Sequence, residues 1–265
     1  MRITANGISI NYQIRGKGTN LVLIHGAGDN LNMWYHQVPV FAKNYRVVTF
    51  DVRGSGKTDR PEGQYSIPLF AEDAYQLMKA IGVDRAYFLG YSMGGRIALE
   101  LAIHHPDLVK GLVLANSSVG IAPPTPESLE RRRVTLELLD NGNLQKVAEM
   151  MITSAFSPNF QSRNPTEFDK YMNVKLQNKP DGIARLMRSF SVPSVPPDLR
   201  RLKCPVLLIV GENDQYMGVE QGRQAHQAIP GSKLVILPTG HAAAIELPER
   251  FNSAVSGFLS SIEKS

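Results

Sequence analysis

The chain has 265 residues, 43% hydrophobic and 20% charged, a balance typical of a globular protein and unlike that of a disordered chain or a membrane span. Its net charge of +5 comes without a long basic face, because the basic run 131–133 is bracketed by Glu127, Glu130 and Glu137; this indicates a salt-bridged helix surface and argues against nucleic acid as a partner. A single cysteine excludes an intrachain disulfide, and the N-terminus lacks an apolar signal segment, so we expect a cytoplasmic protein without a membrane anchor.

The first 120 residues alternate between short apolar runs and helix-like segments. Residues 2–15 alternate in polarity around Asn6-Gly7, which predicts a hairpin. Further strands are expected at 21–24, 46–52, 86–89 and 109–115, and helices at 33–43, 69–81 and from residue 93 onward. Strands that alternate with helices through short connections indicate a parallel sheet.

The pattern changes between residues 121 and 199, where no strand-like run occurs. Helices are expected there at 126–139, 143–155, 166–175 and 181–190, between proline-rich joints at 123–126 and 193–197. Alternation then resumes, with strands at 206–210 and 233–237 and helices at 219–229 and 248–262. The sequence therefore predicts an α/β core made of 1–120 and 200–265, with a helical insertion at 121–199.

Ser92 stands at the centre of Gly90-Tyr91-Ser92-Met93-Gly94, directly between an expected strand and a helix-forming run. The flanking glycines leave no Cβ where the strand end and the helix start approach each other, so the serine hydroxyl can be exposed on a strained turn. This pattern resembles the nucleophile elbow of the α/β-hydrolase superfamily. The resemblance spans essentially the whole chain. It implies a mostly parallel twisted sheet flanked by helices, an inserted helical cap and the chemistry of a serine carboxylesterase or lactonase.

A serine hydroxyl needs a base within hydrogen-bond reach and a third group that orients the base. The resemblance implies the chain order nucleophile, acid, histidine. Asp214 and His241 each follow one of the two late strands, at the edge of a parallel sheet where catalytic groups collect. Glu212 competes with Asp214, but the superfamily pattern Gly-x-x-Asp favours Asp214. The hypothesis is that Ser92, His241 and Asp214 are catalytic.

An oxyanion needs preorganised donors, which backbone N–H groups supply. The Met93 N–H follows Ser92 at the start of a helix, whose dipole strengthens it. The run His25-Gly26-Ala27-Gly28 resembles the His-Gly-x motif of the superfamily, which implies the Ala27 N–H as the second donor and a structural role for His25. A plain glycine-rich turn is the alternative interpretation.

The sequence lacks the residue spacing of phosphate-loop, dinucleotide-binding and metal-binding motifs. No Gly-Lys-Ser/Thr closes the run Gly90-Tyr91-Ser92-Met93-Gly94-Gly95 into a phosphate loop, no Gly-x-Gly-x-x-Gly follows the first buried strand, and no His-Glu-x-x-His indicates a metal site. We therefore expect neither a metal nor a cofactor. Asn116-Ser117-Ser118 matches a glycosylation acceptor, which we treat as coincidence because no secretion signal accompanies it.

Apolar side chains of the expected insertion suit the roof of a substrate pocket. The candidates are Met151, Phe156, Met187 and Phe190. The alternative for each is simple packing of the insertion onto the core. Arg185 and Arg188 would suit recognition of a carboxylate, or they lie in solvent.

The sequence thus predicts hydrolysis of small, moderately apolar carboxylic esters through an acyl-enzyme. Serine at position 92 disfavours haloalkane dehalogenases and epoxide hydrolases, which resemble this layout but carry aspartate there. An enol-lactonase or a carbon-carbon bond hydrolase of ring-fission products is the alternative, although the latter group commonly has tryptophan where this chain has Ala242. A ligand receptor on a hydrolase fold is the non-enzymatic alternative. We expect a small ester or lactone as partner, and a monomer or homodimer.

Overall fold

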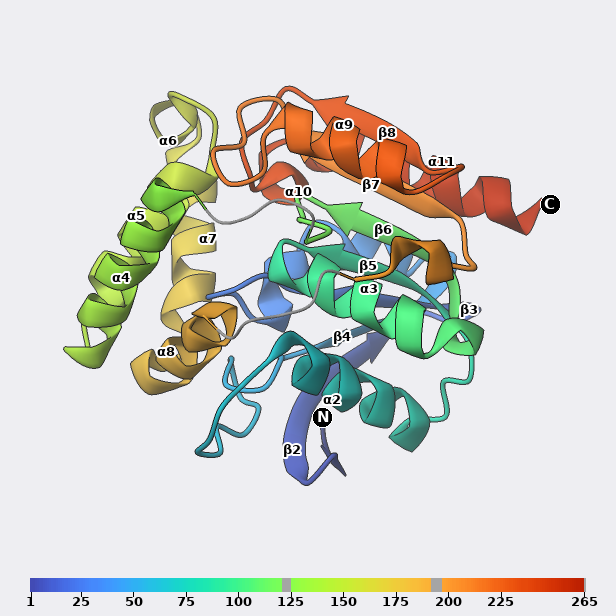
Figure 1. Cartoon of the computed structure of the whole chain (residues 1–265), viewed down its shortest axis with the longest axis horizontal. Coiled ribbons are helices and arrows are strands. Elements are labelled where there is room, and N and C mark those ends of the chain that lie inside the picture. The colour runs from blue at the N-terminus through green and yellow to red at the C-terminus, as the bar shows by residue number, and fades with distance from the viewer. Residues whose placement is uncertain (121–124, 192–196, 265) are drawn as a thin grey trace.

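One eight-stranded sheet runs through the computed structural model, which describes residues 1–120, 125–191 and 197–264 (Figure 1). The strands are β1 (Arg2–Ala5), β2 (Ile8–Arg15), β3 (Thr19–Ile24), β4 (Tyr45–Phe50), β5 (Ala86–Tyr91), β6 (Val109–Ala115), β7 (Val206–Gly211) and β8 (Lys233–Leu237). Their order is β1-β2-β4-β3-β5-β6-β7-β8. Among the described strands, only the β1–β2 and β2–β4 pairs are antiparallel, so β3 to β8 are parallel to one another as predicted.

The antiparallel start follows from its turn residues. Ala5 pairs with Ile8, which leaves Asn6 and Gly7 as a two-residue loop, and both have positive φ, at 48° and 74°. This is the backbone that a type I′ turn requires and that Asn-Gly adopts readily. The predicted hairpin is therefore confirmed.

Helices cover both faces of the sheet because successive strand residues point to opposite sides. The described helices outside residues 121–199 are α1 (Val38–Phe41), α2 (Ile67–Ala80), α3 (Met93–His104), α9 (Val219–Ala228), α10 (Ala243–Glu246) and α11 (Pro248–Glu263). Val22 and Ile24 pack in one core with α2, α3 and α9, whereas Leu21 and Leu23 pack in the other with α1, α10 and α11.

The segment expected to be helical at 33–43, with Pro39 as an interruption, forms two short pieces and not one helix. The structure has a 3₁₀ turn, η1 (Leu31–Trp34), whose Asn30 side chain accepts from the Asn32 N–H, and then the four-residue α1. Pro39 lies in the first turn of α1, where its missing N–H does no harm, but a helix running through it would lose a hydrogen bond and clash. The strand expected at 46–52 also ends earlier, at Phe50.

Between β6 and β7 the chain is helical. The described helices there are α4 (Pro126–Asp140), α5 (Leu144–Ala155), α6 (Phe160–Arg163), α7 (Pro165–Leu176) and α8 (Pro180–Arg188). Two 3₁₀ turns follow them, η3 (Ser189–Ser191) and η4 (Leu199–Arg201). A further 3₁₀ turn, η2 (Pro106–Leu108), lies before β6. Helices α4 to α8 stand together at one end of the molecule, at left in Figure 1. The proline-rich joints fall largely on residues 121–124 and 192–196, which lie outside the described residues.

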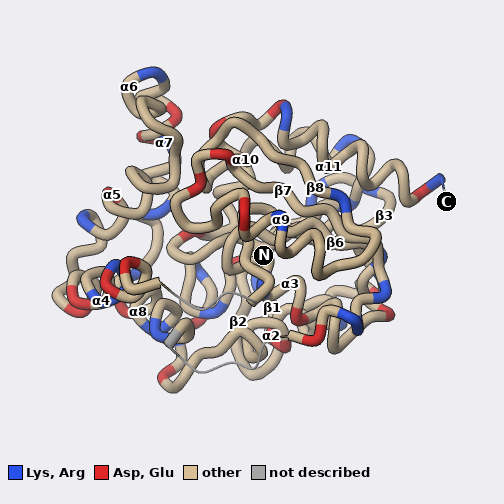
Figure 2. Tube along the Cα trace, turned by 45° about the horizontal axis from the view of Figure 1, so that its top comes forward, with Lys and Arg blue, Asp and Glu red and all other residues tan. Residues whose placement is uncertain are grey.

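Basic and acidic residues are interspersed over the trace (Figure 2). On α4, Arg133 pairs with Glu130 at 2.8 Å and with Glu137 at 3.2 Å, as the spacing predicts. Each helix in the part of the chain that the structure describes is too short or too polar to cross a bilayer.

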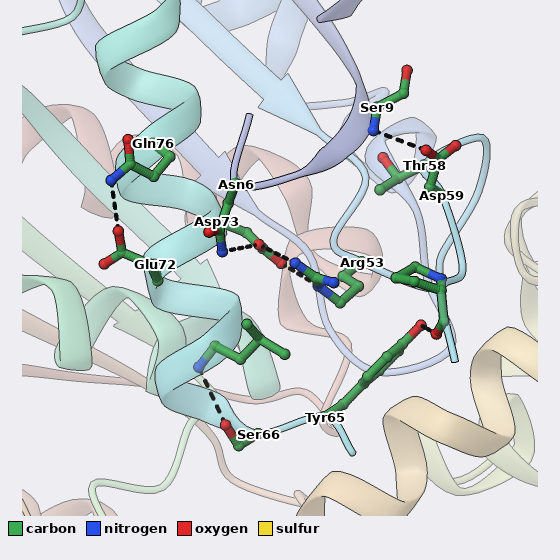
Figure 3. A network of polar contacts seen from close by, with 12 residues as sticks. Asn6, Ser9, Arg53, Thr58, Asp59, Tyr65, Ser66, Glu72, Asp73 and Gln76 are labelled. Carbon is green, nitrogen blue, oxygen red and sulfur yellow. Dashed lines mark hydrogen bonds and ion pairs between the residues drawn. The ribbon is translucent and has the colours of Figure 1, made fainter. Parts of the chain in front are cut away.

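A buried ion pair joins the hairpin, the loop after β4 and α2 (Figure 3). The Asp73 carboxylate accepts from Arg53 Nη2 at 2.6 Å, from Arg53 Nε at 2.7 Å and from Asn6 Nδ2 at 2.7 Å. The two charged side chains are 9% and 3% exposed. Hydrogen bonds to Asp73 raise the pKa of Arg53, so the guanidinium stays charged and depends on this carboxylate.

Asp73→Ala is expected to lower the free energy of unfolding by about 3–5 kcal/mol, because it leaves the Arg53 charge buried without its partner. Urea denaturation followed by circular dichroism measures this loss. Glu137→Ala is the matched control, since Glu137 pairs with Arg133 at the surface, and we expect no measurable change there. Equal losses of unfolding free energy in the two variants would contradict the conclusion that the Arg53 charge depends on Asp73.

Candidate active site

Ser92 lies on a tight turn between β5 and α3. Its backbone has φ 52° and ψ −117°, a strained conformation for a residue with a side chain. A Cβ on Gly94 would lie 2.1 Å from the Ile24 carbonyl oxygen, and one on Gly90 would lie 2.2 Å from the Gly94 oxygen. The two glycines of the motif are therefore required by close approach of backbone to backbone, as the sequence predicts.

The structure brings together the three side chains named from the sequence. His241 Nε2 lies 2.9 Å from Ser92 Oγ, and His241 Nδ1 lies 2.8 Å from Asp214 Oδ2. The three residues follow β5, β7 and β8, whose carboxyl ends share one edge of the sheet. With the ring proton on Nδ1 donated to the carboxylate, Nε2 is free to accept the serine proton.

Asp214 is held by more donors than His241 alone. Its Oδ1 accepts from the N–H groups of Tyr216 at 2.8 Å and Met217 at 2.9 Å, and its Oδ2 accepts from Asn116 Nδ2 at 3.0 Å. Burial alone would raise the pKa of Asp214, but the His241 charge and these hydrogen bonds outweigh it and lower that pKa. The carboxylate is therefore ionised at neutral pH. Glu212, the sequence-level competitor, is exposed.

Asn116 is a site residue that the sequence did not reveal as one. It is 1% exposed, and its φ of 49° turns its amide toward Asp214. Asn116 directly follows β6 and has left-handed backbone, and neither feature gives a distinctive pattern in the sequence. Burial also accords with treating the Asn-Ser-Ser match as coincidence.

The loop that carries His241 is fastened to the end of α5. Glu246 Oε2 accepts from the N–H groups of Gly240 at 2.8 Å and Ser157 at 3.1 Å, and the Ala242 N–H donates to Ala155 O at 2.8 Å. The rings of Tyr91 and Tyr216 flank the imidazole, with centroids 5.2 and 4.7 Å away. These contacts fix the orientation of the base.

Among the described residues, the backbone N–H groups of Ala27 and Met93 have no protein acceptor, and Ala27 lines the same cavity as Ser92. Met93 is the first residue of α3, and the contact of Gly94 with the Ile24 and His25 carbonyls sets the helix start against the loop after β3. His25 orders this loop, because its Nε2 accepts from the Val52 N–H at 2.9 Å and its Nδ1 donates to Gly26 O at 2.8 Å. Burial lowers the pKa of His25, so it is neutral.

A cavity of about 720 Å³ opens onto Ser92 and His241. Met151, Met187 and Phe190 line it as the sequence predicts. Phe156 does not, and this is a correction: its side chain is 4% exposed and its ring stacks on Phe160 with centroids 4.1 Å apart. Phe156 directly follows α5, at its C-cap, and its ring packs in the hydrophobic core.

Basic residues also line the cavity, but they are not the two arginines that the sequence suggested for recognition of a carboxylate. Arg185 donates to Arg60 O and Arg188 pairs with Asp140, and neither reaches the cavity. The lining instead includes Arg131, Arg132, Lys146 and Lys175. The Arg131 guanidinium lies 4.6 Å from the Tyr216 ring centroid. The three residues of the basic run 131–133 therefore differ in their surroundings: Arg133 forms surface pairs on α4, whereas Arg131 and Arg132 line the cavity.

Within residues 1–120, 125–191 and 197–264, no group of three His, Cys, Asp or Glu side chains is arranged to hold a metal ion. The side chains that meet at the cavity are a hydroxyl, an imidazole and a carboxylate, and the N–H groups of Ala27 and Met93 have no protein acceptor among the described residues. This set can transfer an acyl group from an ester to water.

A family model described as alpha/beta hydrolase fold matches residues 19–248. 3-Oxoadipate enol-lactonase 2 of Acinetobacter baylyi is 29% identical over 259 residues, which cover 97% of this chain and 95% of that protein. The crystal structure of the enol-lactonase from Burkholderia xenovorans LB400 superposes with a TM-score of 0.91 at 28% identity, covering 98% of this chain and all of that one. A thermophilic esterase from Thermogutta terrifontis gives a TM-score of 0.89 at 27% identity, covering 99% and 98%.

Proposed function

Because the chain belongs to the α/β-hydrolase fold family, we propose that it is a serine hydrolase that cleaves carboxylic esters of small, moderately apolar acids. The hydrolase activity of its relatives supports an enzyme. The observation that carries the proposal is the pair of contacts at His241, 2.9 Å to Ser92 and 2.8 Å to Asp214, at the wall of a cavity.

In the first half of the proposed reaction, Ser92 Oγ attacks the ester carbonyl while His241 Nε2 takes the serine proton. The carbonyl oxygen becomes an oxyanion, which accepts hydrogen bonds from the N–H groups of Ala27 and Met93. The tetrahedral intermediate then collapses, and the ester carbon-oxygen bond breaks. His241 gives its proton to the leaving alkoxide, so an alcohol departs and an acyl-Ser92 remains.

In the second half, His241 takes a proton from water as the water oxygen attacks the acyl carbonyl. Collapse of the second tetrahedral intermediate returns that proton to Ser92 Oγ and releases the acid. Asp214 stays ionised throughout, because its lowered pKa favours the carboxylate, and it holds the imidazole in the required tautomer. Met151, Met187 and Phe190 offer apolar surface for the acyl or alcohol group.

Hydrolysis of an enol-lactone that carries a carboxylate is the second candidate. The same attack opens the ring, so the leaving oxygen stays attached to the acyl group. Arg131 favours this candidate. Its guanidinium lies over the Tyr216 ring, which in turn contacts His241, and Arg131 lines the cavity. It forms no ion pair among the described residues, so it can pair with a substrate carboxylate. Relatives named as enol-lactonases give it further support.

Substrate preference and covalent chemistry can be tested together. We expect turnover of p-nitrophenyl butyrate, with a butyryl adduct found by mass spectrometry on the Ser92 peptide after an acid quench. If an enol-lactone is the better substrate, Arg131→Gln should lower the ratio of its kcat/KM to that of the neutral ester by about tenfold or more. Lys203→Gln is the control, since Lys203 does not line the cavity. Failure to turn over any ester or lactone would favour the ligand-receptor alternative.

A further inference from the structure

The loop that carries Ala27 is joined to α7 by a buried ion pair. Lys175 Nζ donates to Asp29 Oδ1 at 2.7 Å, and the two side chains are only 4% and 1% exposed. The ammonium also lies 4.8 Å from the Tyr171 ring centroid. Asp29 stands two residues after Ala27, and both members of the pair line the cavity. A charge pair this deeply buried persists only when both partners are present.

Amide side chains add further links between the same two segments. Asn30 Nδ2 donates to Val174 O at 2.7 Å, and Asn178 Nδ2 donates to Gly28 O at 2.9 Å. Asn178 Oδ1 in turn accepts from the Gly56 N–H at 2.7 Å. The C-terminal end of α7, together with Asn178 just after it, is therefore bonded directly to the backbone and side chains of residues 28–30.

This loop has few other means of holding its shape. It follows the end of β3, and Gly28 has φ 74°, so no strand pairing or helix fixes it. His25 secures its beginning, as described above, and the Leu31 N–H secures its end by donating to Asp51 Oδ1 at 2.8 Å. Between these two points, the Asp29 N–H donates to Gly26 O at 3.2 Å and closes a turn around Ala27. The links described above join this turn to α7 and the residues after it, and so restrain the Ala27 N–H.

We propose that Lys175 and Asn178 are positioning residues for the oxyanion hole, acting through Asp29 and the Gly28 carbonyl. This inference rests on the proposed function. A displacement of about 1 Å in a group that stabilises a transition state can cost about 100-fold in rate, so the site depends on this restraint. The helical segment at 121–199 therefore does more than line the cavity, because its helix α7 restrains the loop that carries the Ala27 N–H.

The test compares kcat and KM for p-nitrophenyl butyrate in four variants. Lys175→Met and Asn178→Ala remove links to the loop, and Lys175→Met/Asp29→Asn removes the ion pair without leaving an unpaired carboxylate. Glu167→Gln is the matched control, because Glu167 Oε1 joins α7 to Tyr35 at 2.6 Å and His36 at 2.8 Å, away from the loop. We expect kcat to fall about 10- to 100-fold in Lys175→Met and in the double variant, with KM within about threefold, and little change in Glu167→Gln.

Affinity for a boronic acid that adds to Ser92 should fall in parallel with kcat, since the adduct uses the same donors. Lys175→Arg should recover part of both losses, because a guanidinium can still pair with Asp29. If the double variant is folded and its kcat matches that of Glu167→Gln, the positioning role is wrong. If the wild-type protein turns over no ester, or Ser92→Ala retains full activity, the proposed function itself fails.

Discussion

Ser92→Ala is expected to lower kcat for p-nitrophenyl butyrate by at least about 10⁴-fold and to abolish the acyl adduct. The variant lacks the oxygen that attacks the ester, while the amide donors and the cavity remain. Alanine keeps the Cβ that already occupies the turn at φ 52°, so the backbone strain is unchanged and the protein should fold. Steady-state kinetics and mass spectrometry measure the two effects, and thermal unfolding checks the fold.

Ser154→Ala is the control for this variant. Ser154 also lines the cavity, but its hydroxyl bonds to Met150 O at 2.7 Å and to the Tyr216 hydroxyl at 2.6 Å rather than to His241. A serine that only shapes the cavity should change kcat by no more than about tenfold when truncated. Comparable losses in the two variants would show that Ser92 is not the nucleophile.

The parts of the site that the sequence predicted have local causes. Gly90, Ser92 and Gly94 mark a turn whose backbone crowding demands glycine. Asp214 and His241 follow strands that apolar runs make recognisable, and parallel strands end at one edge of a sheet. Three distant residues could therefore be placed near one another without coordinates.

The supporting contacts have no such local cause. Asn116 meets Asp214 across 98 positions, and Lys175 meets Asp29 across 146. On α7, Lys175 has the pattern of an ordinary lysine in a helix's last turn, and only the packing of that helix against the loop after β3 buries it. The sequence places Arg131 on a solvated helix surface, whereas it lines the cavity. Helical spacing identifies the neighbours of a residue on its own helix but not the element that faces that helix.

Asp214→Asn is expected to lower kcat by about 10⁴-fold with the protein still folded. The side-chain oxygen will stay where Oδ1 accepts from the Tyr216 and Met217 N–H groups, so the new NH₂ group will face His241 Nδ1. Two donors cannot hydrogen-bond to each other, and the imidazole therefore adopts the other tautomer, with its proton on Nε2. In that form Nε2 points a proton at Ser92 and cannot accept the one that the attack releases.

Glu212→Gln is the matched control, because it removes the neighbouring carboxylate that the sequence alone could not dismiss. Glu212 is exposed and forms no hydrogen bond to His241, so we expect kcat within about twofold of the wild-type value. Kinetics on both purified variants decide between the two acids. An Asp214→Asn variant that keeps more than about a tenth of the wild-type kcat would mean that another group orients the base, since a His241 held in the wrong tautomer cannot support that rate.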